Sequence, residues 1–125
     1  MNQLIGQKRK HDVVWHRSGK IELSAYVVKE LWIARGDSIG VMGDKGEYYL
    51  YVSSKGDRGI RCKATCYPSR KGGRNMKTHC KELTDAIYRL VGIDAEGREK
   101  IKMAVGDIRE LAGRKCLVLL YMLRI

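Results

Sequence analysis

The chain has 125 residues, of which 44% are hydrophobic, so it is long enough for one domain with a real core and too apolar for a disordered tail. Its formal net charge of +11, from 25 Lys and Arg against 14 Asp and Glu, favours a polyanionic partner, either nucleic acid or an anionic membrane surface. No apolar run approaches the roughly 18–20 residues that span a bilayer, and no apolar stretch follows the first basic residues as in a secretory signal. We therefore expect a cytoplasmic protein without a membrane partner, whose four cysteines are thiols.

Residues 1–12 are polar and carry the basic run Lys8, Arg9 and Lys10. This pattern predicts a flexible basic arm, which serves either as a plain leader or as a strap on a phosphate backbone. We expect residues 13–125 to form a single domain. Its two halves, 13–54 and 58–125, are separated by a polar loop.

The first half begins with β signals at 13–15 and 20–23, where Ile21 and Leu23 alternate with charged residues. Ser24 is a good helix N-cap, and the i,i+4 pairs Val27/Leu31 and Val28/Trp32 predict one apolar stripe on a short helix. Gly36 can end this helix, because glycine accepts the left-handed conformation.

A strand starting at 39–41, the turn 43–46 and a returning strand at 48–52 predict a β-hairpin. Tyr48, Leu50 and Val52 should lie on one face of the returning strand, with Tyr49 and Tyr51 on the other.

From Arg58 to Lys81 the chain has no acidic residue. Within this tract, residues 61–66 alternate between basic or polar side chains and small apolar ones, which predicts a strand that Pro68 ends. The basic residues of the tract are Arg58, Arg61, Lys63, Arg70, Lys71, Arg74, Lys77 and Lys81.

A second helix is predicted from Thr78 to Gly92, since apolar residues recur there at helical spacing. Alternation at 100–105 predicts a strand, and the turn 112–115 leads into 116–123, which is apolar on both faces and should be a central strand. The expected fold is α+β, a small mixed β-barrel or sheet with two short helices in the order ββαββ-βαββ. Similar Leu and Ile positions after each helix suggest a degenerate internal repeat.

One family resemblance follows from the first half. Residues 13–52 resemble the AbrB-like swapped-hairpin DNA-binding domains. The resemblance rests on Gly19-Lys20-Ile21-Glu22-Leu23-Ser24, a short helix ending Leu31-Trp32-Ile33, the pair Gly36-Asp37 and the hairpin that follows. Ser24 stands where the family usually has Pro, Trp32 where it has Gly, and Lys20 where it often has Arg.

The resemblance implies a β-barrel built from two such units with exchanged hairpins, either as a homodimer or as an internal pseudo-dimer of one chain. It also implies that basic residues around the first turn and helix face DNA. Carried over to this chain, these residues are Arg17, Lys20, Lys29 and Arg35.

The basic tract should contact phosphates in a salt-dependent manner, and its arginines could also reach guanine edges or a narrow minor groove. We therefore expect a transcriptional regulator that binds double-stranded DNA, with no cofactor. The predicted nucleic-acid-binding residues are Arg17, Lys20, Lys29, Arg35, Arg58, Arg61, Lys63, Arg70, Lys71, Arg74 and Lys77.

The same residues are compatible with other functions. Tyr48, Tyr49, Tyr51 and Tyr67 could stack on unpaired bases, which would give a single-stranded DNA or RNA-binding domain. The positive charge could instead serve an acidic protein partner. A zinc site is not expected, because the adjacent His79 and Cys80 cannot easily join Cys62 and Cys66 at one metal. No catalytic triad, phosphate loop or carboxylate cluster indicates an enzyme.

Overall fold

The computed structural model describes residues 11–53, 60–61, 64–70, 73–92 and 96–121. The first half of the chain contains β1 (Val13–His16), β2 (Lys20–Leu23), α2 (Ala25–Leu31), β3 (Ser38–Asp44) and β4 (Glu47–Ser53). The second half contains β5 (Ile60–Arg61), β6 (Tyr67–Pro68), β7 (Met76–His79), α3 (Lys81–Val91), β8 (Lys100–Leu111) and β9 (Arg114–Leu120).

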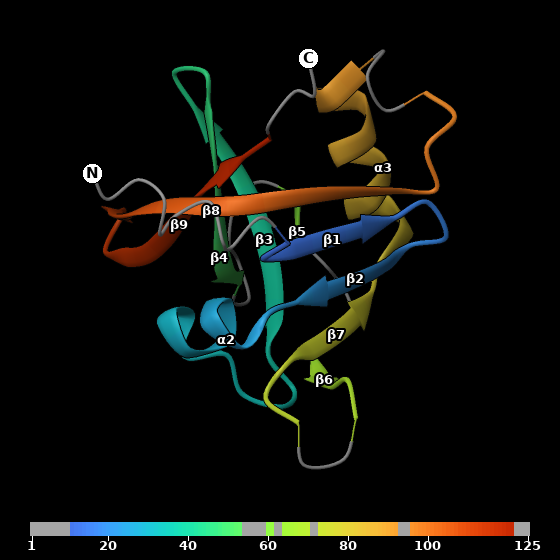
Figure 1. The fold of residues 1–125 in the computed structure, drawn as a ribbon. Helices are drawn as coiled ribbons and strands as arrows, with labels where there is room; N and C mark the ends of the chain where they lie inside the picture. The colour runs from blue at the N-terminus through green and yellow to red at the C-terminus, as the bar shows by residue number, and fades with distance from the viewer. Residues whose placement is uncertain (1–10, 54–59, 62–63, 71–72, 93–95, 122–125) are drawn as a thin grey trace, which may run out of the picture.

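All described strand pairs are antiparallel, and they form one sheet in the order β5-β3-β4-β9-β8-β1-β2-β7-β6. Figure 1 shows this sheet curling into a half-barrel. The fold is therefore α+β, as predicted. The second-half hairpin β8–β9 lies between the two first-half hairpins, so both halves of the sequence contribute to the same sheet.

The long strand β8 joins the two parts of the sheet. Its first residues pair with β1, whereas Ala104–Leu111 pair with β9. The register with β9 shifts between Val105 and Ile108. A bulge of this kind bends a strand and increases its twist, which lets β8 belong to both parts of the curled sheet.

The main core lies on one face of the sheet, between the strands and the helices. The side chains of Trp15, Ile21, Leu23, Leu83 and Ile87 are almost completely buried there. The i,i+4 spacing of Leu83 and Ile87 on α3 places both on the side that packs against β1 and β2.

The returning strand β4 divides its side chains between two cores, as its alternation predicts. Leu50 belongs to the main core, whereas Tyr49 and Tyr51 form a second cluster with Cys116 and Val118 on the opposite face. Strand β9 lies between β4 and β8, and its residues Cys116, Leu117 and Val118 are all buried. The predicted central strand is therefore present, but it runs from Arg114 to Leu120 and not over 116–123, and Leu120 is 41% exposed.

Several predicted boundaries are wrong. The second helix begins at Lys81, because Thr78 pairs with Ile21 in the sheet. Of the predicted strand 61–66, Arg61 lies in β5, the described residues 64–66 are not in a strand, and Pro68 belongs to the next strand, β6. Proline is tolerated there because β6 is an edge strand, where its missing N–H group costs no ladder hydrogen bond.

The end of the first helix also differs. The helix stops at Leu31, and Trp32, which we predicted on its apolar stripe, is the C-cap. Trp32 has left-handed φ and ψ of 54° and 46° and is 84% exposed. Gly36, with φ of 97°, lies in the turn that follows.

The predicted basic arm lies outside the described residues up to position 10. Its last residue, Asp12, is buried, so the anchored part of the chain begins before Val13. Among the described residues, no helix is long and apolar enough to cross a membrane.

Candidate nucleic-acid interface

The sheet face that points away from the main core carries a continuous cationic surface. Successive side chains of a strand alternate between the two faces of the sheet. The residues that alternate with the buried side chains of Val13, Trp15, Ile21 and Leu23 therefore point outward. Cross-strand register aligns these outward residues into two rows. The first row is Lys102, Val14, Glu22, Lys77 and Tyr67; the second is Lys100, His16, Lys20 and His79.

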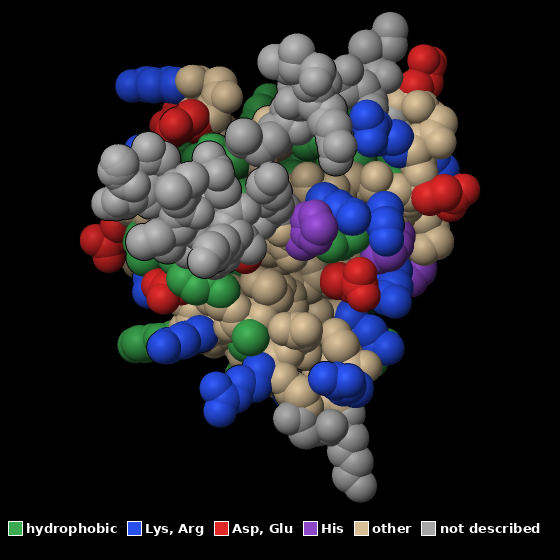
Figure 2. Space-filling view, viewed as in Figure 1, with side chains coloured by type: hydrophobic (Ala, Val, Ile, Leu, Met, Phe, Trp, Pro, Cys, Tyr) green, Lys and Arg blue, Asp and Glu red, His purple; other side chains and the backbone are tan. Residues whose placement is uncertain are grey.

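We call this surface the cationic face. It carries four lysines, two histidines and one carboxylate, that of Glu22. Figure 2 shows Lys, Arg and His side chains gathered over β8, β1, β2 and β7, with acidic side-chain atoms among them. Since the lysines outnumber the carboxylate, this surface attracts anions.

Glu22 is the one acidic residue of the cationic face, and it contacts His16 and Lys20. Its Oε1 lies 2.8 Å from Nε2 of His16, and its Oε2 lies 3.6 Å from Nζ of Lys20. The hydrogen bond from His16 lowers the pKa of Glu22, a smaller effect of burial raises it, and the charge of Lys20 lowers it further. Glu22 is therefore ionised near neutral pH, and it lies between the His16 imidazole and the Lys20 ammonium group.

A pocket of about 540 Å³ opens at one end of the cationic face. Val14 and Glu22 line it from the sheet, Ser24 from the start of α2, and Arg70 and Arg74 from the β6–β7 loop. Both arginines are exposed, and they face the pocket together with His11. Arginine suits planar recognition of phosphate oxygens, so this pocket can accept a phosphate group.

The β6–β7 loop is held in place by its own backbone and by Asn75. The Ser69 amide donates to the Asn75 carbonyl at 2.9 Å, and the Gly73 amide donates to the Arg70 carbonyl at 2.9 Å. The Asn75 side chain accepts from the Ala25 amide at 2.8 Å, which ties the loop to the start of α2. These bonds fix where the described part of the loop presents Arg70 and Arg74.

The other predicted residues do not all belong to this surface. Lys20 and Lys77 lie on the cationic face, and Arg70 and Arg74 line its pocket. Lys29 and Arg35 are exposed near the C-terminal end of α2. Arg58, Lys63 and Lys71 lie outside the described residues, and Arg61 is placed only by its backbone in β5, at the other end of the strand order.

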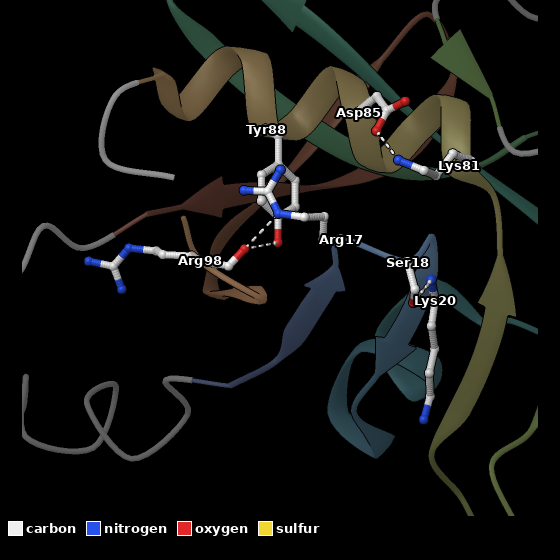
Figure 3. Close-up of polar contacts among 7 residues, drawn as sticks. All are labelled: Arg17, Ser18, Lys20, Lys81, Asp85, Tyr88 and Arg98. Carbon is white, nitrogen blue, oxygen red and sulfur yellow. Dashed lines mark hydrogen bonds and ion pairs between the residues drawn. The ribbon is translucent and has the colours of Figure 1, made fainter. Parts of the chain in front are cut away.

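Arg17 has a structural role that the sequence does not reveal. Figure 3 shows its guanidinium over the ring of Tyr88 on α3, 4.5 Å from the centroid. Its Nε donates to the Arg98 carbonyl at 3.0 Å, and the Tyr88 hydroxyl donates to the same carbonyl at 3.3 Å. Burial raises the pKa of Tyr88, an effect that Arg17 opposes. Arg17 thus joins the β1–β2 turn to α3, which limits its reach toward a ligand.

Lys81, the last basic residue of the tract, is paired with Asp85 one helical turn further along α3, at 2.8 Å. Its charge is partly compensated on the helix surface.

Sequence reasoning missed four residues of the cationic face: Lys100, Lys102, His16 and His79. The signal for the two lysines was present, because they alternate with Ile101 and Met103 in a predicted strand. The sequence does not reveal that β8 pairs with β1. This pairing aligns Lys102 with Val14 and Lys100 with His16.

The predicted tyrosine platform is wrong for two of its members. Tyr49 is 4% exposed and Tyr51 is fully buried, so neither can stack on a base. Tyr48 and Tyr67 are partly exposed on different strands. The ring of Tyr67 lies 5.5 Å from Nζ of Lys77 on the cationic face.

Within the described part of the chain, no group of three or more His, Cys, Asp or Glu side chains could hold a metal ion. His79 is exposed, whereas the neighbouring Cys80 is buried with Cys66 in the main core.

Searches of protein-family models, curated proteins and solved structures each gave no match to this chain.

Proposed function

We propose that this protein binds nucleic acid, and duplex DNA in particular, through the cationic face and its arginine-lined pocket, in the manner of a transcriptional regulator. The observation that carries the proposal is the alignment of Lys102, Lys77, Lys100 and Lys20 in two rows across four neighbouring strands. Such a grid can neutralise several phosphates at once and release their counterions.

The dimensions of the cationic face favour a duplex. Neighbouring strands are about 4.8 Å apart, so the row from β8 to β6 extends about 19 Å. The major groove of B-DNA is about 12 Å wide, so the row is long enough to contact phosphates on both sides of a groove. Arg70 and Arg74 stand near the β6 end of that row, where they could bind one further phosphate.

We also propose that the chain is an internal pseudo-dimer of the swapped-hairpin type. The run β1-β2-α2-β3-β4 is followed by β6-β7-α3-β8-β9. In the sheet, β4 pairs with β9 and β2 with β7, which are corresponding strands of the two runs. These relations support the resemblance to AbrB-like domains.

The test is a titration of fluorescent duplex DNA at increasing salt. We expect the logarithm of the binding constant to fall linearly with the logarithm of salt concentration. Replacing Lys77 and Lys102 by Glu should lower the slope by about 2, since two phosphate contacts are lost. The same change of net charge at Lys45 and Arg89, which are exposed outside the two rows, is the control.

Equal weakening by both double variants would mean that binding responds only to overall charge, and would remove the cationic face as the site. Binding to heparin as strong as binding to DNA would favour an acidic protein or other polyanion as the partner.

A further inference from the structure

Trp32 is an exposed aromatic residue in a backbone conformation that does not suit it. It caps α2 with φ of 54° and ψ of 46°, and 84% of its surface is accessible. Side chains with a Cβ are disfavoured in this left-handed region, so a large residue here costs folding free energy. Because the ring is so exposed, burial of the indole contributes little stabilising free energy to offset that cost.

The C-cap of the second helix also has positive φ. The residue there is Gly92, with φ of 73° and ψ of −135°, outside the left-handed helical region that Trp32 adopts. The other tryptophan, Trp15, is fully buried in the main core. Trp32 is therefore placed neither for packing nor for backbone geometry, which points to a role at the surface.

The surroundings of Trp32 are cationic. Lys29 lies one helical turn before it and Arg35 three residues after it, both exposed. Nζ of Lys115 lies 6.0 Å from the centroid of the Trp32 ring, at the outer limit of a cation–π contact, and 3.7 Å from a carboxylate oxygen of Glu30. Figure 2 shows hydrophobic side-chain atoms protruding beside Lys or Arg side chains over α2.

We propose that Trp32 stacks on an unpaired base of a bound nucleic acid, while Lys29 and Arg35 contact the flanking phosphates. This inference rests on the proposed function and extends it, because it gives the protein a second contact that duplex phosphates alone would not use. An exposed ring between cations is the arrangement by which proteins hold single strands, where each stacked base contributes to affinity whatever its sequence.

Tryptophan fluorescence tests the proposal directly, because Trp15 is buried and Trp32 is not. The intact protein is titrated with oligo-dT at low salt, and the same titration of Trp32→Gly supplies the signal of Trp15 alone. We expect quenching of the Trp32 signal by oligo-dT. Heparin, a polyanion without bases, should leave that signal unchanged. Trp32→Gly should also bind oligo-dT at least about fivefold more weakly.

Stability separates a loss of stacking from a loss of fold. Trp32→Gly relieves the left-handed strain, so its melting temperature should rise by about 2–5 °C while its affinity falls. Trp32→Tyr keeps an aromatic ring and should retain most of the affinity. A general structural role would instead lower stability and affinity together.

The outcomes distinguish this inference from the function on which it rests. If oligo-dT binds with no change in Trp32 fluorescence, or if heparin quenches equally, base stacking is wrong although the cationic face remains a nucleic-acid site. If neither duplex nor single strand binds at low salt, both proposals fail.

Discussion

Asp12 is a buried carboxylate that connects three parts of the chain. Its Oδ1 accepts from the Ser24 hydroxyl at 3.2 Å, its Oδ2 accepts from the Val105 amide at 3.1 Å, and its carbonyl accepts from the Ser24 amide at 2.9 Å. The Ser24 oxygen in turn accepts from the Val27 amide at 3.3 Å and caps α2. Asp12 thus orients the helix cap and fastens β8 beside it.

We expect Asp12→Ala to lower the free energy of unfolding by about 2–3 kcal/mol, because it leaves the Val105 amide buried without this acceptor and loosens the cap. Urea denaturation measures the change. The control is Asp107→Ala, whose carboxylate is 78% exposed and should matter by less than about 0.5 kcal/mol. Equal effects of the two substitutions would contradict a structural role for Asp12.

Glu22 gives the molecule a predictable response to acid. Its pKa is lowered from the ordinary value of 4.5, mainly by the hydrogen bond from His16. A carboxylate whose pKa is lower in the folded state stabilises the fold above its unfolded pKa, and this contribution disappears as pH falls through the folded pKa. The melting temperature of Glu22→Gln should therefore lie below that of the unaltered protein near neutral pH. The difference should shrink as the pH falls below 4.5 and vanish once Glu22 is protonated in the folded protein. A difference that stays constant with pH would refute the linkage.

At the residue scale, the sequence predicts what depends on near neighbours. Ser24 was recognisable as an N-cap because its partner, Val27, lies three residues away. The bond from Asp12 to Val105 spans 93 positions, and no local pattern could reveal it. For Trp32, the local pattern predicted the wrong environment. Its i,i+4 relation to Val28 predicts a shared stripe, but the helix ends before Trp32 and its ring points outward.

Strands β3 and β4 approach each other closely at Gly40, which faces a buried aromatic ring. A Cβ on Gly40 would lie 2.7 Å from both Cζ and the hydroxyl oxygen of Tyr51, its cross-strand partner. Tyr51 is fully buried, and the guanidinium of Arg114 lies 4.8 Å from its ring centroid, so the ring has little room to move. The ring thereby covers a strand position that has no side chain of its own.

Gly40→Ala should consequently destabilise the protein by about 1–3 kcal/mol through overpacking. Gly106→Ala is the matched control in another strand. The nearest atom there is Cδ1 of Leu120, at 3.0 Å, on a side chain that is 41% exposed and can turn aside. Thermal denaturation of the two variants should show a clear loss for Gly40→Ala and a small change for Gly106→Ala. The opposite order would show that Tyr51 is not held against the sheet.

At the element scale, the strongly patterned segments were predictable and the short ones were not. The hairpin turn was predictable from Gly46, which adopts positive φ there, although the second positive φ belongs to Lys45 and not to Gly43. Strands β5 and β6 contain two residues each, too few to establish an alternation. Residues 61–66 alternate in the sequence, but hydrogen bonds from Cys66 to Asp37 and from Ser38 to Ala64 place part of this segment against the start of β3.

For the whole molecule, the net charge predicted a polyanionic partner but not the surface that would meet it. The cationic face combines residues of β1 and β2 with residues of β6, β7 and β8, which are far apart from them in the sequence. The basic tract pointed to Lys77, Arg70 and Arg74. Lys100 and Lys102 join them only through the strand order, which depends on tertiary packing rather than on local pattern.

The proposed pseudo-dimer makes a prediction about assembly. A swapped-hairpin homodimer needs a second chain to complete its sheet, but here β4 pairs with β9 and β2 with β7 within one chain. We therefore expect light scattering to give a mass near 14.2 kDa, that of one chain. The melting temperature should also be independent of protein concentration, because unfolding a monomer involves no dissociation. A mass of about twice that value, with a melting temperature that rises with concentration, would instead show that two chains exchange hairpins.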